Sequence, residues 1–151
     1  MRRAVQFAGL TLTGLLAGNE LGTLIGSHPA LRSLPLAAEI EAEQAFTARL
    51  GQFMPVYKTS TLVAAVAAAV DRRGAPGRRL AAASAAASAL ALVITLAGNV
   101  PLNARTLSYL GDGPADGWAD IRDRWERLHR VRVLLELAAF GALTTAALND
   151  A

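Results

Sequence analysis

Four long apolar segments divide this chain, and a polar segment separates each one from the next. They cover residues 4–26, 53–71, 80–98 and 130–148. As a helix, the first would be about 35 Å long, enough to cross the roughly 30 Å hydrocarbon core of a bilayer. Hydrophobic residues make up 53% of the 151 residues and charged residues only 18%, which is outside the usual balance of a soluble domain. We therefore predict an all-α fold with one domain over residues 1–151, an integral membrane four-helix bundle in contact with the lipid bilayer.

The first segment follows a positive start and contains a glycine at every fourth position. A positively charged N-terminus before a short apolar run is also the signature of a signal peptide. We favour a retained helix, because the apolar pattern continues past any plausible cleavage point. Glycines on one face predict close packing against another helix, either the third segment with its small Ser84 and Ser88 or a second copy in a homo-oligomer. These glycines are Gly14, Gly18, Gly22 and Gly26.

Residues 36–50 predict a short amphipathic helix between the first two spans. Glu39 and Glu43 share a helical face with Phe46 and Leu50. We expect this helix to lie on the membrane surface or to cap the bundle, with its two acids in solvent. From Pro55 to the end of the second span a helix would reach only about 25 Å, so we expect that helix to begin before the proline.

Arginines mark one end of the predicted bundle. The chain start and the loop between the second and third spans are very short and rich in arginine, which predicts a cytoplasmic location for this end and for both termini. The net charge is +3, but the arginines lie at segment ends rather than in a patch with aromatic residues, so we expect no nucleic-acid binding. The chain has no cysteine, which excludes disulfides and thiol catalysis. The arginines are Arg2, Arg3, Arg72, Arg73, Arg78 and Arg79.

Most polar side chains that could take part in catalysis or binding converge at the opposite side of the predicted bundle. On the fourth helix, Trp125, His129, Arg132 and Glu136 recur at helical spacing and form one stripe. Charged side chains at this depth should face the bundle interior, and the same holds for Glu20 in the first span. The alternative is structural: an ion pair that anchors the helix, with tryptophan and arginine at the membrane interface. The other converging residues are His28, Tyr57, Lys58, Asn99 and Asn103.

Four short motifs carry a family resemblance that covers nearly the whole chain. They are SHPAL at 27–31, MPVYK at 54–58, NVPLNARTL at 99–107 and RWERLHRVR at 124–132. With them the chain resembles the anthrone oxygenase-like family of small four-helix membrane proteins. An acidic residue is common before the histidine of the first motif, where this chain has Ser27, which leaves Glu20 as the candidate for that role. The resemblance implies a monooxygenase that converts an anthrone, a lipophilic aromatic of the polyketide type, into a quinone with molecular oxygen as co-substrate.

That reaction needs a base and hydrogen-bond donors for an enolate. His129 suits the base, because imidazole exchanges a proton near neutral pH. Asn99, Asn103 and Arg132 are the candidate donors, with Glu20 as a further catalytic candidate. The candidate substrate-binding residues are Tyr57 and Lys58 for phenolic oxygens, Trp125 for stacking on a flat ring, and His28. An apolar substrate would reach such a site laterally from the membrane.

Two alternatives stay open at this point. The oxygen chemistry is either cofactor-free or dependent on a metal such as non-haem iron or copper, bound by His28, His129 and a carboxylate of Glu20, Glu39 or Glu43. No glycine-rich phosphate loop and no nucleophile elbow occurs in the sequence. The second alternative is a non-enzymatic membrane protein that binds an apolar metabolite or a partner protein, in which the polar cluster serves folding.

Overall fold

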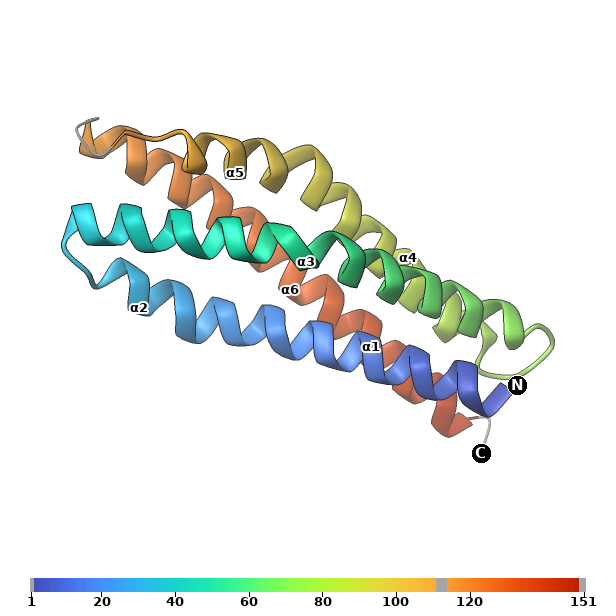
Figure 1. The fold of residues 1–151 in the computed structure, drawn as a ribbon. Helices are drawn as coiled ribbons and strands as arrows, with labels where there is room; N and C mark the ends of the chain where they lie inside the picture. Colours follow the sequence, from blue (N-terminus) through green and yellow to red (C-terminus); the bar gives the residue numbers. More distant parts are fainter. Residues whose placement is uncertain (1, 111–113, 150–151) are drawn as a thin grey trace.

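The structure, a computed structural model, describes residues 2–110 and 114–149, and these ranges form four long helical rods without a strand (Figure 1). The first rod joins α1 (Arg2–Gly22), the π-helical η1 (Thr23–Ser27) and α2 (His28–Arg32). The second is α3 (Leu36–Asp71). The third joins α4 (Arg78–Ile94), the π-helical η2 (Thr95–Asn99) and α5 (Val100–Leu107), and the fourth is α6 (Ala115–Asn149). The predicted all-helical bundle is confirmed.

Three of the rods are long and apolar enough to cross a membrane. They are α3, the continuous helix at Arg78–Leu107, and α6. The protein is therefore a membrane protein. The described part of the first rod does not meet the same criterion, so its predicted crossing at residues 4–26 stays a prediction. At 36 and 35 residues, α3 and α6 would each be more than 50 Å long, well beyond the roughly 30 Å hydrocarbon core.

The segment at residues 36–50 is not a separate amphipathic helix. It forms the first part of α3, which continues through Pro55 into the second apolar span. The helix does begin before the proline, as expected. The prediction of solvated acids is wrong, because Glu43 is fully buried and Glu39 is 9% exposed. Both carboxylates instead meet side chains of α6, described below.

The rods pack as a square in which each rod contacts the next along the chain, and the fourth rod closes the square against the first. α1 packs on α3 and α6, and α4 packs on the same two helices. In the part of the chain that the structure describes, α1 and α4 are diagonal and do not pack together, so the predicted contact between the first and third spans is wrong. Ser88 of α4 instead donates to the carboxylate of Glu136 on α6.

The glycine face of α1 packs closely at one point only. A Cβ at Gly14 would lie 2.9 Å from the ring of Phe140 on α6, whereas one at Gly18, Gly22 or Gly26 would meet nothing within 4 Å. Close packing is therefore confirmed at Gly14 and wrong for the other three inside this bundle. The predicted homo-oligomer is not tested by this arrangement and stays a prediction.

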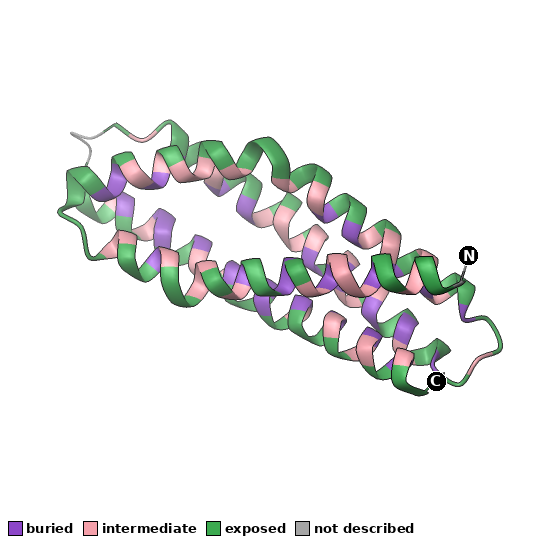
Figure 2. Cartoon of the chain, turned by 60° about the horizontal axis from the view of Figure 1, so that its bottom comes forward, coloured by how far each residue is buried: buried purple, intermediate pink, exposed green. Residues whose placement is uncertain are grey.

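The interior differs between the two ends of the bundle. Near the arginine-rich α3–α4 loop, where α1 begins and α6 ends, small apolar side chains fill the core, namely Ala68, Ala81, Leu143 and Ala146 (Figure 1). Buried positions continue on the inner faces of the helices towards the other end (Figure 2). The residues buried there are largely polar or charged. The site lies where these two kinds of interior meet.

Candidate active site

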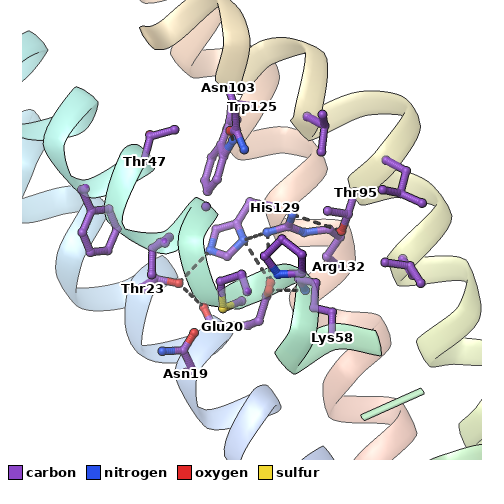
Figure 3. A pocket seen from close by; sticks show the side chains of 18 of the residues that line it. Asn19, Glu20, Thr23, Thr47, Lys58, Thr95, Asn103, Trp125, His129 and Arg132 are labelled. Carbon is purple, nitrogen blue, oxygen red and sulfur yellow. Dashed lines mark hydrogen bonds and ion pairs between the residues drawn. The ribbon is translucent and has the colours of Figure 1, made fainter. Parts of the chain in front are cut away.

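A cavity of about 320 Å³ opens between the four rods at this junction. Its volume lies at the small end of the roughly 300–1,000 Å³ range of ligand sites. One wall is apolar, with Leu50, Met54, Leu92 and Leu96. The polar wall is formed by residues from all four rods, which are labelled in Figure 3, namely Glu20, Thr23, Lys58, Thr95, Asn103, Trp125, His129 and Arg132.

Glu20 is the centre of the polar wall. Its Oε1 accepts a hydrogen bond from Nζ of Lys58 at 2.5 Å, and its Oε2 accepts one from Nη2 of Arg132 at 3.1 Å (Figure 3). The three side chains are 2%, 6% and 5% exposed. A buried charge needs partners, and each cation here finds one in the same carboxylate. The prediction that Glu20 and Arg132 face the interior is confirmed.

Both ring nitrogens of His129 have partners. Nδ1 lies 2.9 Å from Nη2 of Arg132 and 3.3 Å from Oε2 of Glu20, and Nε2 lies 3.1 Å from Oγ1 of Thr23. A guanidinium only donates, so Nδ1 accepts and the ring proton sits on Nε2. Thr23 accepts from Nε2 and donates its own hydroxyl proton to the backbone carbonyl of Glu20 at 2.9 Å. His129 is therefore held by contacts from both ring nitrogens between α1 and α6.

The two π-helical segments place one threonine each on this wall. Thr23 opens η1, and Thr95 opens η2 and accepts a hydrogen bond from Nη1 of Arg132 at 3.3 Å. The same pattern, Thr-Leu-x-Gly-x-x-Pro, occurs at residues 23–29 and 95–101. A proline cannot donate to the carbonyl four residues earlier and its ring clashes with that carbonyl, which favours the wider turn just before it.

A second polar cluster lies earlier on α6, towards the polar end of the bundle. Nη2 of Arg122 donates to Oε1 of Glu43 at 2.8 Å, and Nδ1 of His28 lies 3.0 Å from the same oxygen. All three side chains are at most 3% exposed. One turn earlier on α6, the indole of Trp118 donates to Oε1 of Glu39 at 3.0 Å. These pairs explain why the acids of α3 are inside the bundle.

Trp125 lies between the two clusters. Its ring centroid is 4.7 Å from that of His28 and 4.8 Å from that of His129, and the guanidinium carbon of Arg122 is 4.9 Å from it. The indole Nε1 donates to Oδ1 of Asn103 at 2.6 Å, which fixes the ring. The cavity thus has an aromatic face whose orientation is set by a hydrogen bond.

Two predicted site residues lie outside the cavity. Asn99 is buried, and its amide donates to the backbone carbonyl of Trp125 at 3.2 Å. Tyr57 is half-buried on α3, next to Lys58. Neither is among the described residues that line the cavity, so their placement does not support direct substrate contact. The cavity brings together the other predicted residues: Glu20, His28, Lys58, Asn103, Trp125, His129 and Arg132.

The residues of the predicted metal site do not form a ligand set. Within residues 2–110 and 114–149, no group of three His, Asp or Glu side chains is placed to hold a metal ion. Glu20 is shared by two cations, and Glu43 accepts from Arg122. Carboxylates engaged in this way are neutralised by protein cations rather than gathered for a metal.

Several residues of this arrangement were missed by the sequence reasoning. Arg122 lies three residues before Trp125 on the same helical stripe, so the periodicity could have included it. The threonines at positions 23 and 95 could have been found from the repeated seven-residue pattern. Nothing in the sequence pairs Arg122 with Glu43, because the two lie 79 residues apart.

Comparison with known protein families gives a match. A family model described as anthrone oxygenase matches residues 43–142. The matched range contains Lys58, Trp125, His129 and Arg132, whereas Glu20 and the rest of the first rod lie before it. No curated protein and no solved structure matches the chain.

Proposed function

This chain belongs to the anthrone oxygenase family, and from that premise we propose that it is a membrane-embedded monooxygenase acting on a lipophilic aromatic substrate of the anthrone type. Such a substrate carries a ring methylene between two aryl rings, opposite a ketone. Oxidation turns the methylene into a second ketone. One atom of molecular oxygen enters the product, and the other leaves as water together with the two methylene hydrogens.

The observation that carries the proposal is the pair of buried cations on the cavity wall. Lys58 and Arg132 converge on the single carboxylate of Glu20, while Glu136, one turn further along α6, accepts from Ser88 instead. Two fixed cations in a site shielded from water stabilise a negative charge that develops on a substrate oxygen. Loss of a methylene proton places that charge on the ketone oxygen as an enolate.

The enolate forms by proton removal and then reacts with oxygen. A cavity histidine takes the proton, and Trp125 offers a flat face for the aryl rings. The enolate carbon reduces oxygen and forms a C–O bond, and the peroxide recovers a proton to become a hydroperoxide. Breaking the O–O bond then releases hydroxide, which leaves with the second methylene proton as water and gives the quinone.

Access to the site suits a substrate dissolved in the membrane. Some cavity residues are also exposed on the outer surface of α3 and of the third rod, namely Gly51, Pro55, Leu96 and Val100. An apolar molecule in the bilayer meets these residues without crossing water. We further propose that the end with the arginine-rich loop faces the cytoplasm, because Arg73, Arg78 and Arg79 are exposed there.

The proposal is tested by oxygen uptake when anthrone is added to membranes that contain the protein, with empty membranes as the background for autoxidation. Arg132→Gln removes a buried donor and is expected to lower the uptake by about 10²-fold or more. Arg130→Gln is the matched control, because Arg130 lies two positions away with a side chain 62% exposed. Equal abundance and melting temperature of the variants exclude misfolding.

The alternatives give different outcomes. Saturable binding of anthrone without uptake above background supports the non-enzymatic binding protein and removes the oxygenase. Uptake that is equal in Arg132→Gln and in Arg130→Gln removes the role of the buried cations. Absence of both uptake and binding removes anthrone as the ligand.

A further inference from the structure

We propose that His28 is the general base of this reaction and that its Nε2 takes the methylene proton, an inference that rests on the proposed function. Two histidines line the cavity, His28 and His129, and the residues around them leave different nitrogens free. The geometry therefore distinguishes a base from a ring that only holds the site together.

His129 has no nitrogen left for a substrate proton. Its Nδ1 accepts from Arg132 at 2.9 Å, and its Nε2 donates to Thr23 at 3.1 Å. A guanidinium next to the accepting nitrogen also opposes the arrival of a further positive charge on the ring. His129 thus acts as a positioning residue that fixes Arg132 and the start of η1.

His28 is held in the opposite way. Its Nδ1 is closer to Oε1 of Glu43, at 3.0 Å, than to Nη2 of Arg122, at 3.2 Å. At His129 the order is reversed, because Nδ1 is closer to the guanidinium than to the carboxylate. In the proposed base, Nδ1 carries the proton and donates it to Glu43, and Nε2 keeps a lone pair. Nε2 is buried and has no hydrogen-bond partner among the described residues.

The surroundings of His28 suit proton removal from an aromatic substrate. Its ring is packed by Phe46, Trp125 and His129, with centroids 5.7, 4.7 and 5.4 Å away. These rings close Nε2 off from water, and they form the part of the cavity where aryl rings stack. The nitrogen without a partner therefore belongs to a ring that lines the cavity among the aromatic side chains expected to hold the substrate.

The base and the anion-stabilising cations also lie at different heights of the cavity. His28 meets α6 at Arg122 and Trp125, which precede Arg132 by ten and seven positions. The ring of His28 is nevertheless only 5.4 Å, centroid to centroid, from that of His129, whose Nδ1 lies 2.9 Å from Nη2 of Arg132. In the substrate, the methylene and the ketone occupy opposite corners of the central ring. A substrate that lies along the cavity can present its methylene to His28 while its oxygen faces Lys58 and Arg132.

The proton-transfer step can be written with its electrons in balance. A methylene C–H bond breaks, an N–H bond forms at Nε2 of His28, and the electron pair of the C–H bond moves into the ring system and onto the ketone oxygen. Glu43, which also accepts a hydrogen bond from Arg122, holds Nδ1–H and stabilises the imidazolium. After oxygen has added, Nε2 returns the proton to the peroxide.

The test isolates this step from the oxygen chemistry. Anthrone with deuterium in the methylene is incubated without oxygen in ordinary water with membranes that contain the protein, and loss of deuterium is followed by mass spectrometry above the rate in empty membranes. The wild-type protein is expected to accelerate the loss. His28→Gln is expected to lower that acceleration by about 10²-fold or more, and His129→Gln by less than about tenfold.

Four further variants keep the test decisive. Exogenous imidazole is expected to restore exchange in His28→Ala, which a purely structural role would not allow. Glu43→Gln is expected to slow exchange and Glu43→Asp to recover part of it, while Glu41→Gln, an exposed acid on the same helix, leaves it unchanged.

The outcomes separate this inference from the proposed function. Oxygen uptake by the wild type together with undiminished exchange in folded His28→Gln, or exchange lost in His129→Gln alone, overturns the role of His28 and leaves the oxygenase standing. Oxygen uptake without any anaerobic exchange also overturns it. If the wild type shows neither uptake nor exchange, the proposed function itself fails.

Discussion

The imidazole rings of His28 and His129 lie 5.4 Å apart, centroid to centroid, with an interplanar angle of 78°. Each ring is the third member of a triangle with one glutamate and one arginine, Glu43 with Arg122 in one and Glu20 with Arg132 in the other. The triangles differ in which partner is closer to the imidazole. On this difference rests the proposal that the two histidines hold opposite tautomers within one cavity.

The charges around Glu20 predict that its neutralisation lowers the stability of the protein strongly. Glu20→Gln leaves Lys58 and Arg132 buried without their shared carboxylate, and we expect a loss of about 3–5 kcal/mol in the free energy of unfolding. Thermal unfolding of the purified protein in detergent measures it. The double variant Glu20→Gln/Lys58→Met should recover part of the loss, because one unpaired charge is removed. A melting temperature equal to that of Glu41→Gln, an exposed control, would contradict this account.

Removal of the Thr23 hydroxyl is predicted to cause a selective loss of activity. Thr23→Val removes the acceptor of the Nε2 proton of His129, which leaves a buried donor unsatisfied at about 1–3 kcal/mol. We expect oxygen uptake to fall about tenfold for that energy, while Thr23→Ser keeps most of it. Thr59→Val is the matched control, because this exposed threonine only bonds the backbone carbonyl of Pro55. Equal uptake in the valine and serine variants would mean that the hydroxyl does not hold the site.

The cavity wall at Gly51 predicts a steric effect on substrate binding. A Cβ at Gly51 would meet nothing within 4 Å, and the residue lines the cavity, so Gly51→Leu should fold and partly fill the site. We expect the KM for anthrone to rise with little change in abundance. Gly18→Leu is the control, because that position is equally open but lies outside the cavity lining. Equal effects of the two substitutions would indicate that the substrate binds elsewhere.

The absence of cysteine from the sequence makes the proposed topology simple to measure. Single cysteines at Ser33, Pro76 and Ser108 would lie at exposed positions in connections between rods. A membrane-impermeant thiol reagent should label Ser33→Cys and Ser108→Cys in intact cells and Pro76→Cys only after permeabilisation. Labelling of Pro76→Cys alone in intact cells would reverse the orientation, and labelling of Ser33→Cys and Ser108→Cys on different sides would remove a membrane crossing.

The local periodicity of the sequence determined much of this protein. Apolar segments of sufficient length predicted helices in a membrane, and the spacing of Trp125, His129, Arg132 and Glu136 predicted one buried stripe on α6. Both predictions need only the helical repeat and the high free energy of a charge in lipid, which act within a single segment. The burial of Glu20 followed from the same argument.

The tertiary structure alone decided which of these groups are partners. Glu20 meets Lys58 and Arg132 across 38 and 112 residues, and Glu43 leaves solvent only because Arg122 of α6 lies opposite it. The same holds for the extension of α3 through residues 36–50, whose acids would be placed in water by their local pattern. Packing between rods also decides which groups surround the ring nitrogens of His28 and His129. A sequence repeat fixes the face on which a side chain lies, but its partner depends on how separate helices pack, and that packing is a property of the whole bundle.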